Sequence, residues 1–381
     1  MTVELAAVLG WAMVGCAALP CAMTAWNLLL YRRPPMSGEP LTARDRVDVC
    51  IPARNEAANI EACVRGVLES VEVPVRACVY DDQSTDATPE ILRGLVEADE
   101  RVIRVPTQPL PDGWNGKQWG CERMGRASDA TWLLFTDADV RLDPRAVAAS
   151  VRFAHRSGSD LVSTFPREIC GSLGEALTVP MIHFVLLGYL PMGFMRRDRR
   201  PALAAGCGQF LLVRREAWQR SGGHAAFKAS MHDGIKLPRS VRAAGGRTDL
   251  FDGTDLVSCR MYRGFSQSWR GFVKNAYEGL GSIGTLLFFT IMHVVGHLLP
   301  WAVAVVAIAG AAWGRALIGH ATLAIVLGLL TRVMLATRFR QPWSAVALHP
   351  VGVALMTAIQ WTSLWVATRG RREWKGRVAG A

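Results

Sequence analysis

The nine cysteines of this 381-residue chain show no Cys-x-x-Cys pair and no repeated spacing. This absence argues against a disulfide framework and against the common zinc motifs. Several of the cysteines lie inside apolar runs, which indicates buried, reduced thiols that pack as small hydrophobic groups. Such thiols are typical of a soluble domain that faces a reducing cytosol.

The chain also lacks a long internal repeat, a low-complexity tract and a clear small-residue cleavage site near its start. Its first apolar stretch, Leu5 to Leu30, is too long for the core of a signal peptide. We therefore predict an uncleaved transmembrane helix. Because Arg32 and Arg33 follow at once, the C-terminal end of this helix is expected on the cytoplasmic side.

Half of the residues are apolar, and the apolar excess lies at the two ends of the chain. That distribution is typical of a membrane protein that carries a soluble domain. The net charge of +11 does not favour nucleic-acid binding, because the basic residues crowd beside apolar stretches, where they suit lipid headgroups. Examples are Tyr31-Arg32-Arg33, Arg196 to Arg200 and Arg369 to Arg372.

The composition predicts five segments along the chain. They are an N-terminal anchor (1–31), a linker (32–46), an α/β domain (47–280), a C-terminal transmembrane region (281–368) and a basic tail (369–381). The transmembrane region offers three apolar stretches, Ile283 to Trp313, Ala316 to Ala336 and Ala345 to Ala367. Three spans that start in the cytosol would place the basic tail outside, so a re-entrant or split stretch remains an alternative.

Strand and helix patterns alternate through the central domain, which predicts a mostly parallel sheet. Short apolar runs predict strands at 47–52, 75–80, 101–105, 132–135, 161–165 and 206–213. The apolar stretch Leu177 to Met195 contains two prolines and falls inside this domain, so we predict an interfacial or groove-lining element rather than a span. An ordinary core helix is the alternative.

Three acidic clusters suggest a site. Asp81-Asp82 and Asp137-Ala138-Asp139 follow predicted strands, and Asp233 precedes a predicted helix. If Asp137 and Asp139 are extended, their side chains point the same way and can share a hard divalent cation. A surface turn at Asp137 and a helix cap at Asp233 are the alternatives.

A nucleotide diphosphate bound at such a site would need several kinds of group. Asp81 or Asp82 can accept hydrogen bonds from the base or ribose, and Asp233 remains free to take a proton from an acceptor hydroxyl. The candidates for neutralising the phosphate charge are Arg54, Lys117, Arg260 and Arg263.

The order of these motifs resembles that of the inverting glycosyltransferases of family 2, which have the GT-A fold, over about Val47 to Glu278. Pro52-Ala53-Arg54-Asn55-Glu56 is similar to the opening motif of that family, and Asp81 to Asp86 is similar to its nucleoside-contacting segment. The resemblance implies that Asp137 and Asp139 form the metal-binding D-x-D motif, with Asp139 as the usual ligand. It also implies that Asp233 is the catalytic base and that Arg260-x-x-Arg263 holds the diphosphate. Pro52, Arg54, Glu56, Asp81, Asp82 and Lys117 would complete the donor site.

Two residues depart from this pattern. His232 replaces the usual acid before the base, and Gly264 stands where a tryptophan is expected after Arg263. In processive synthases of the family that tryptophan stacks on the growing chain, so its absence favours transfer of a single sugar, although Trp269 could compensate. The stretch Gly113 to Trp119 and the arrangement of apolar segments resemble the hopanoid-associated and carotenoid glycosyltransferases, which implies a lipid acceptor.

We therefore expect an enzyme that transfers a sugar with inversion from a nucleotide-diphosphate sugar, probed first as a UDP-sugar, to an isoprenoid-type membrane lipid. The expected cofactor is Mg²⁺ or Mn²⁺, and the expected location is the plasma membrane with the catalytic domain facing the cytoplasm. The alternatives are a processive polysaccharide synthase and an inactive protein that binds nucleotide sugars. A nucleotidyltransferase ranks below them, because the loop after the first strand contains no glycine.

Overall fold

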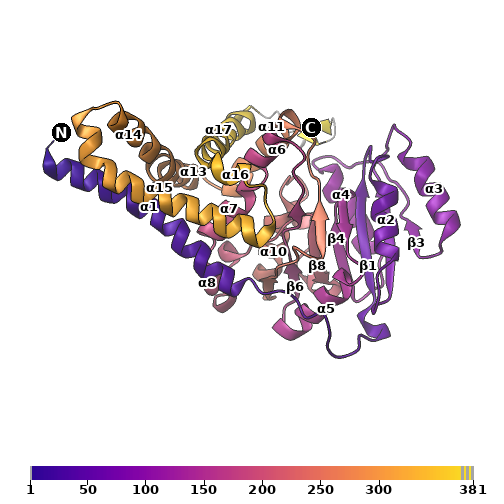
Figure 1. The fold of residues 1–381 in the computed structure, drawn as a ribbon. Helices are drawn as coiled ribbons and strands as arrows, with labels where there is room; N and C mark the ends of the chain where they lie inside the picture. Colours follow the sequence, from indigo (N-terminus) through magenta and orange to yellow (C-terminus); the bar gives the residue numbers. More distant parts are fainter. Residues whose placement is uncertain (1, 370–372, 375–376, 379–381) are drawn as a thin grey trace. The chain divides into compact units, whose positions relative to one another are not determined.

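The computed structural model describes residues 2–369, 373–374 and 377–378, so most of the predicted basic tail lies outside the described residues (Figure 1). The chain divides into two compact units. The α/β unit comprises Tyr31–Arg167, Gly193–Arg260 and Arg371–Ala381, and the helical unit comprises Met1–Leu30, Glu168–Met192 and Met261–Gly370. Residues 168–192 and 261–280 thus group with the apolar helices, and the predicted domain limits stay a prediction.

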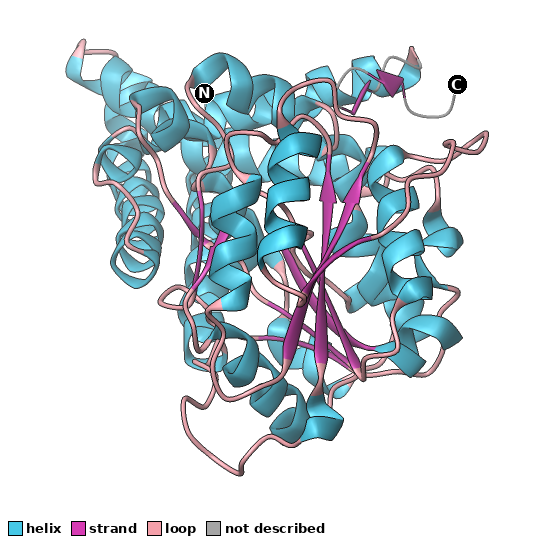
Figure 2. Cartoon of the chain, turned by 90° about the vertical axis from the view of Figure 1, so that its right-hand side faces the viewer, coloured by secondary structure: helices cyan, strands magenta, loops and turns pink. Residues whose placement is uncertain are grey.

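A seven-stranded sheet forms the centre of the α/β unit, with the strand order β3-β2-β1-β4-β8-β6-β9 (Figure 2). The pairs β3–β2, β2–β1, β1–β4 and β6–β9 are parallel, whereas β8 runs antiparallel to both of its neighbours. The predicted mostly parallel sheet is therefore confirmed. The strands are β1 (Val47–Ala53), β2 (Val75–Asp81), β3 (Val102–Arg104), β4 (Trp132–Thr136), β6 (Leu161–Ser163), β8 (Phe210–Arg214) and β9 (Thr248–Leu250).

The two central strands are β1 and β4, and every residue in both is buried. Continuous apolar runs of this kind suit strands that are covered on both faces. Pro52 sits near the end of β1, where it has no N–H to donate. The pairing with β4 ends at Cys50, so Pro52 lies beyond that ladder and costs it no hydrogen bond.

Helices pack against this sheet. The helix α4 (Gly116–Ala127) contacts β1 and β2, and α2 (Ile60–Leu68) contacts β2. A short antiparallel pair, β5 (Val140–Leu142) with β10 (Val257–Cys259), lies beside α2. The remaining elements are α3 (Thr88–Ala98), α5 (Ala146–Ser157), β7 (Arg167–Glu168), α8 (Met192–Arg197), α9 (Arg215–Arg220), α10 (Asp233–Ala243), β11 (Glu373–Trp374) and β12 (Arg377–Val378).

The helical unit contains four helices that are long and apolar enough to cross a membrane among the described residues. They are Glu4–Leu30, Ile283–Ile308, Ala312–Phe339 and His349–Thr368, with mean hydropathies of 1.9, 2.0, 1.8 and 1.3. The first and third belong to α1 (Val3–Leu30) and α15 (Ala312–Phe339), which run side by side (Figure 1). The second joins α13 (Ile283–His293), a π-helical turn (Val294–Leu298) and α14 (Leu299–Ile308), and the fourth is α17 (His349–Thr368).

The apolar stretch 177–195 is broken into α6 (Leu173–Thr178), α7 (Met181–Tyr189) and the start of α8. The helix α7 packs against α1 and α15, with Phe184 and Leu187 fully buried. Buried Asn27 of α1 ends this helix, because its amide donates to the carbonyls of Leu187 at 2.8 Å and Leu190 at 2.7 Å. The segment therefore contributes a core helix to the helical unit, and its interfacial position stays a prediction. Three shorter helices complete the unit: α11 (Phe265–Val273), α12 (Ala276–Leu280) and α16 (Ser344–Ala347).

Candidate active site

The acidic clusters predicted from the sequence all lie in the α/β unit. Asp81 is the last residue of β2, Asp137 follows β4 directly, and Asp233 is the first residue of α10. Because β1, β2 and β4 are parallel, their carboxyl ends lie at one edge of the sheet. Ligands bind at this edge in open α/β sheets.

The backbone of the Asp137-Ala138-Asp139 segment differs from the prediction. We expected an extended strand end with both carboxylates on one side, but β4 ends at Thr136 and the next residues form a turn. The N–H of Val140 donates to the carbonyl of Asp137 at 3.2 Å, which closes this turn. The predicted extended conformation was therefore wrong and the alternative of a turn is present, because two aspartates after a strand favour a turn.

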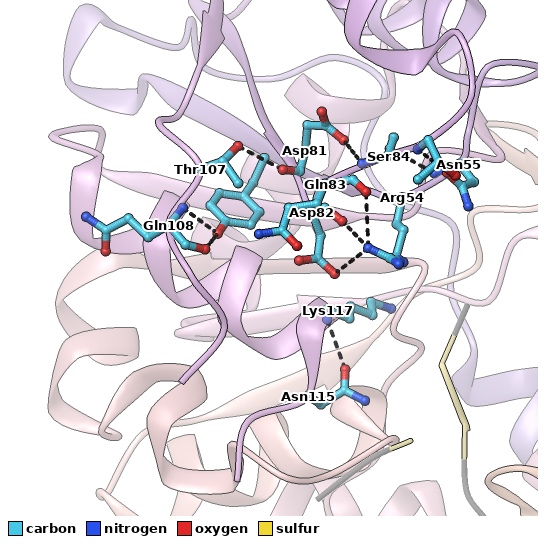
Figure 3. A network of polar contacts seen from close by, with 12 residues as sticks. Arg54, Asn55, Asp81, Asp82, Gln83, Ser84, Thr107, Gln108, Asn115 and Lys117 are labelled. Atoms are coloured by element: carbon cyan, nitrogen blue, oxygen red, sulfur yellow. Dashed lines mark hydrogen bonds and ion pairs between the residues drawn. The ribbon is translucent and has the colours of Figure 1, made fainter. Parts of the chain in front are cut away.

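Lys117 links two of the clusters. It is the second residue of α4, whose first turn is capped by the side chain of Asn115 (Figure 3). Its Nζ lies 2.7 Å from Oδ1 of Asp137 and 2.9 Å from Oδ2 of Asp233. Burial disfavours the charged ammonium, but the two carboxylates raise the pKa of Lys117 well above its ordinary value. The structure thus places a charged lysine between the predicted metal motif and the predicted base.

Asp233 is buried and ionised. Burial tends to raise the pKa of its carboxyl, but the nearby Lys117 ammonium outweighs burial, and the pKa is lowered from its ordinary value. The residue also begins α10, where the helix dipole favours a negative charge. At position 233 a carboxylate can therefore stay deprotonated in a site that excludes most water.

Glycines fix the position of Asp233. A Cβ atom at Gly208 would lie 2.1 Å from Oδ1 of Asp233, and one at Gly234 would lie 2.7 Å from the backbone nitrogen of Gly208. The turn at 206–209 and the start of α10 therefore approach each other more closely than any side chain allows. We predicted a strand from Gly206, but β8 begins at Phe210, because this turn precedes it. We did not predict the role of Gly208. The two glycines at positions 206 and 208 could have indicated a close approach of the backbone to another element.

Asp139 has the properties of a cation ligand. Its Oδ1 is buried and has no hydrogen-bond partner among the described residues. Burial, together with the negative charges of Asp137 and Glu56, raises the pKa of Asp139 to about 7. Clustered carboxylates with an unsatisfied oxygen suit a hard divalent cation, which takes oxygen ligands and completes its shell from phosphate and water. No three His, Cys, Asp or Glu side chains of the described chain converge to hold an ion alone.

The loops after β1 and β2 are tied together at the same edge of the sheet (Figure 3). The Arg54 guanidinium donates to the carbonyls of Asp82 and Gln83, and it lies 3.7 Å from Oδ2 of Asp82. The N–H of Asn55 donates to Oγ of Ser84 at 2.9 Å. Asn55 and Gln83 both have positive φ angles, of 53° and 54°, so each loop turns sharply. The predicted donor residues Arg54 and Asp82 therefore act as one structural unit.

Asp81 is fixed separately from Asp82. Its Oδ1 accepts from the N–H of Ser84 at 3.1 Å, and its Oδ2 lies 3.5 Å from the guanidinium of Arg104. Thr107 donates to the Asp81 carbonyl at 2.9 Å, so the chain after β3 folds over this strand end (Figure 3). These contacts hold a buried carboxylate beside loops whose backbone groups can reach a ligand.

The remaining predicted residues have different surroundings. Glu56 accepts a hydrogen bond from the Asn59 amide at 3.0 Å, and it lies close enough to Asp139 to raise its pKa. His232 donates its backbone N–H to Oγ of Ser230 at 3.0 Å. Arg260 belongs to the α/β unit and Arg263 to the helical unit, so their joint hold on a diphosphate stays a prediction.

The segment before Asp233 is held by α4, which the sequence did not reveal. The N–H of Asn115 donates to the carbonyl of Lys228 at 2.7 Å, and the Gln118 amide donates to the carbonyl of Ser230 at 3.2 Å. One helix therefore positions both Lys117 and the loop that carries the predicted base. The sequence singled out the stretch Gly113 to Trp119. Residue spacing alone could not show that this stretch contacts Lys228 and Ser230.

Comparisons with known proteins bear on the fold and the family of this chain. A 4,4'-diaponeurosporenoate glycosyltransferase of Staphylococcus haemolyticus (strain JCSC1435) is 25% identical over 260 residues, 68% of this chain and 66% of that protein. An uncharacterized protein of Mycobacterium tuberculosis (strain CDC 1551 / Oshkosh) is 36% identical over 105 residues, 28% of this chain and 31% of that protein. The matches thus span about two thirds and one third of those relatives.

A solved structure with a similar fold is the mannosyltransferase PcManGT from Pyrobaculum calidifontis in complex with GDP-Man and Mn²⁺. It has a TM-score of 0.57 and 16% identity, and the match covers 96% of this chain and 99% of that chain. The predicted GT-A-like α/β fold with N- and C-terminal apolar helices is thus confirmed. The family profile described as "Glycosyltransferase like family 2" matches residues 44–257, more than half of the chain, and the chain belongs to this family.

Proposed function

We propose that this protein transfers a sugar from a nucleotide-diphosphate sugar to a membrane lipid, with inversion and with a divalent cation. The observation that carries the proposal is the ion pair of Lys117 with both Asp137 and Asp233. It brings together carboxylates from two distant parts of the chain at the ligand-binding edge of the sheet. A catalytic pocket needs such an assembly, and the family supplies the reaction class.

In the proposed reaction, Asp233 accepts the proton of the acceptor hydroxyl. The acceptor oxygen forms a bond with the anomeric carbon while the bond from that carbon to the diphosphate oxygen breaks, so a single displacement inverts the configuration. The lowered pKa of Asp233 keeps the carboxylate ready to accept the proton at neutral pH. Lys117 supplies positive charge beside both reacting regions.

Asp139 and Asp137 would hold the divalent cation. When bound there, it would neutralise charge on the departing diphosphate. The unsatisfied Oδ1 of Asp139 supports this assignment. The mannosyltransferase of similar fold, described with GDP-Man and Mn²⁺, supports a nucleotide sugar and a metal in general. Asp81 or Asp82 is the proposed contact of the base or ribose, Arg54 is a proposed contact of the phosphates, and UDP is the first nucleotide to test.

A lipid acceptor is supported by two findings. Four helices of the described chain are long and apolar enough to span a membrane. One relative is named for a glycosyltransferase that acts on diaponeurosporenoate, an apolar acid. We propose the plasma membrane as its location, with the α/β unit facing the cytoplasm.

Transfer of one sugar is favoured over polymer synthesis by residue 264. Gly264 has a φ of +93° and precedes α11, and its N–H donates to Oε1 of Glu175 at 2.7 Å. A tryptophan at this position would be strained. The aromatic platform expected of a processive synthase is therefore not compatible with this backbone.

The test is to incubate membranes that contain the full chain with a panel of labelled nucleotide sugars and Mn²⁺, and then to analyse the lipid extract. We expect label in a lipid fraction that disappears with Asp139→Ala. Label in a high-mass polymer would favour the synthase. Nucleotide-sugar binding with no labelled product from any donor would favour the inactive binding protein.

A further inference from the structure

Arg332 is a buried charge in the C-terminal half of the candidate membrane-spanning helix α15. Its side chain is fully buried, and its guanidinium donates from Nη1 to the carbonyl of Pro180 at 3.3 Å. Its Nε has no hydrogen-bond partner, and no carboxylate of the described chain forms an ion pair with it. A buried guanidinium with one carbonyl partner is costly, which is why charges inside membrane segments usually serve a function.

Four of the eight histidines of the chain lie in the same helical unit and are buried. They are His183 on α7, His293 on α13, His297 in the π-helical turn and His349 on α17. Together with Arg332 we call them the Arg332 cluster. It contains one permanent positive charge and four imidazoles.

The members of the Arg332 cluster converge on one region. Nε2 of His349 lies 3.0 Å from Nδ1 of His297, and the ring of Phe184 packs edge-on against both. Gly328 lies one helical turn before Arg332, and a Cβ atom there would lie 3.1 Å from Nδ1 of His297. Arg332 and the contact of Gly328 with His297 and His349 therefore lie on the same face of α15.

Several nitrogen atoms of the cluster have no partner. Nε2 of His293, Nε2 of His297 and Nδ1 of His349 are buried without hydrogen bonds among the described residues. Each unsatisfied polar atom in an apolar region is costly. Three such nitrogen atoms in one cluster therefore indicate a ligand that accepts hydrogen bonds. His293 and His349 can donate or accept according to tautomer, so the cluster can adapt to an anion.

The backbone around His297 is also irregular. The residues Val294–Leu298 form a π-helical turn, and Pro300 follows directly in α14. Proline removes one backbone hydrogen bond, and π-helical turns often mark functional positions in helices. Such a turn can change its hydrogen-bond pattern when a ligand enters.

We propose that the Arg332 cluster binds the carboxylate headgroup of an apolar-chain acid. One guanidinium matches one carboxylate in charge and can bind it through two parallel hydrogen bonds, while the imidazoles donate further bonds. A cation is disfavoured by the charge of Arg332. The inference rests on the proposed function only in naming this acid as the class of the lipid acceptor, whose sugar-accepting hydroxyl is a separate group from the carboxylate held here.

The test measures binding without any nucleotide sugar. The full chain is placed in phosphatidylcholine nanodiscs and titrated with retinoic acid and with retinol, which differ in the carboxylate. We expect retinoic acid to bind at least tenfold more tightly to the wild-type protein. Arg332→Met should remove this preference, whereas Arg315→Gln, which changes an exposed arginine of the same helix, should keep it.

Thermal unfolding separates a binding role from a structural one. Replacing an unpaired buried charge by an apolar side chain should leave the midpoint unchanged or raise it, so Arg332→Met should fold and still lose the preference. A lowered midpoint for Arg332→Met would indicate a structural arginine and overturn the proposal, as would equal binding of the acid and the alcohol by the wild type. His297→Phe is the second variant, and it should also weaken retinoic acid binding.

A third arm identifies the source of the anion. Nanodiscs with phosphatidylglycerol offer a phosphate headgroup in place of a carboxylate. If phosphatidylglycerol abolishes retinoic acid binding, the cluster is a phospholipid site and the assignment to an acceptor is wrong. Failure of sugar transfer with intact acid binding would instead contradict the proposed function and leave this site standing.

Discussion

Lys117 lies between two carboxylates that the reaction would use at different moments. Its Nζ contacts Asp137 on one side and Asp233 on the other, within 3 Å of each. Changes in charge at the donor side are therefore felt at the predicted base. This arrangement makes Lys117 more than a phosphate contact, which is the role that the sequence suggested.

Lys117→Met should destabilise the protein at neutral pH. It leaves Asp137 and Asp233 without their cation, and breaking a buried pair costs about 3 kcal/mol at the low end, which applies here because Asp137 is partly exposed. Mn²⁺ should raise the thermal midpoint of Lys117→Met more than that of the wild type, because a cation can replace the lost charge. Lys236→Met, on α10, is the matched control. An equal rise of the thermal midpoint with Mn²⁺ in Lys117→Met and in the wild type would contradict the role of Lys117.

Asp233→Asn should abolish sugar transfer and leave nucleotide binding largely intact. An amide has nearly the same shape as the carboxylate but cannot accept the proton, and loss of a general base costs roughly 10²–10⁴-fold in rate. The measurement is initial rate together with the dissociation constant of the nucleotide. Asp99→Asn, at the end of α3, is the control. Normal turnover of Asp233→Asn would remove the assignment.

His224 provides a pH-dependent contribution to stability. It is fully buried beside Trp218, and burial lowers its pKa from the ordinary 6.5 to about 3. The unfolded chain binds a proton at this residue below pH 6.5, whereas the folded protein does so only near pH 3. The free energy of unfolding therefore falls as the pH drops through this window, by at most about 1.4 kcal/mol for each pH unit.

The variant His224→Asn should show a smaller loss of thermal midpoint between pH 7.5 and pH 5.0 than the wild type. Asparagine can still accept the hydrogen bond that the Trp218 indole donates to Nδ1 of His224. It does not titrate, so the difference between the two proteins isolates this residue. Identical pH slopes would show that His224 is not held neutral in the folded state.

At the scale of elements, the start of α10 depends on the turn at 206–209. This turn belongs to the chain before β8, some 25 residues away, and it approaches the helix so closely that Gly208 has no room for a side chain. The position of the predicted base is therefore set by the contact between two elements as well as by the helix that carries it.

Gly208→Ala should lower the transfer rate roughly 10²-fold with little effect on nucleotide binding. The added methyl group would overlap the Asp233 carboxylate, and a displacement near 1 Å costs a catalytic group about this much. The control is Gly94→Ala in α3, where a Cβ meets no atom within 4 Å, and alanine should leave the rate unchanged and stabilise the helix slightly. Full activity of Gly208→Ala would show that Asp233 is not the base.

At the scale of the whole molecule, we predict that the four candidate spans all cross the membrane, which would place both ends of the helical unit on one side. Arg32 and Arg33 after the first helix and Arg338 and Arg340 at the end of α15 mark the opposite side as cytoplasmic. Each of the three C-terminal stretches is long and apolar enough to cross a membrane.

Reporter fusions test this topology. A fluorescent protein joined after residue 340 should be active in the cytoplasm, whereas alkaline phosphatase joined after residue 310 or residue 368 should be active outside. The last fusion is the decisive one, because the basic tail alone would predict the inside. Cytoplasmic fluorescence from a fusion after residue 368 would mean that one of the four helices does not cross the membrane.

The sequence by itself determined the class of fold and the order of the elements. The buried runs at 47–53 and 132–136, the four apolar helices and the acidic motifs are local patterns, and local patterns are set by period and propensity. The site residues Asp81, Asp137 and Asp233 could be named because carboxylates at strand ends and helix starts are visible in the chain.

Only the tertiary structure decided how those residues meet. Lys117 was expected on a phosphate and is held by two aspartates, the Asp137-Ala138-Asp139 segment turns instead of extending, and the guanidinium of Arg332 donates to the carbonyl of Pro180 inside the helical unit. The first and the last of these facts depend on contacts between residues far apart in the chain. Sequence spacing does not show such contacts, because the burial of a residue and its distance to a partner are fixed only when the elements pack together.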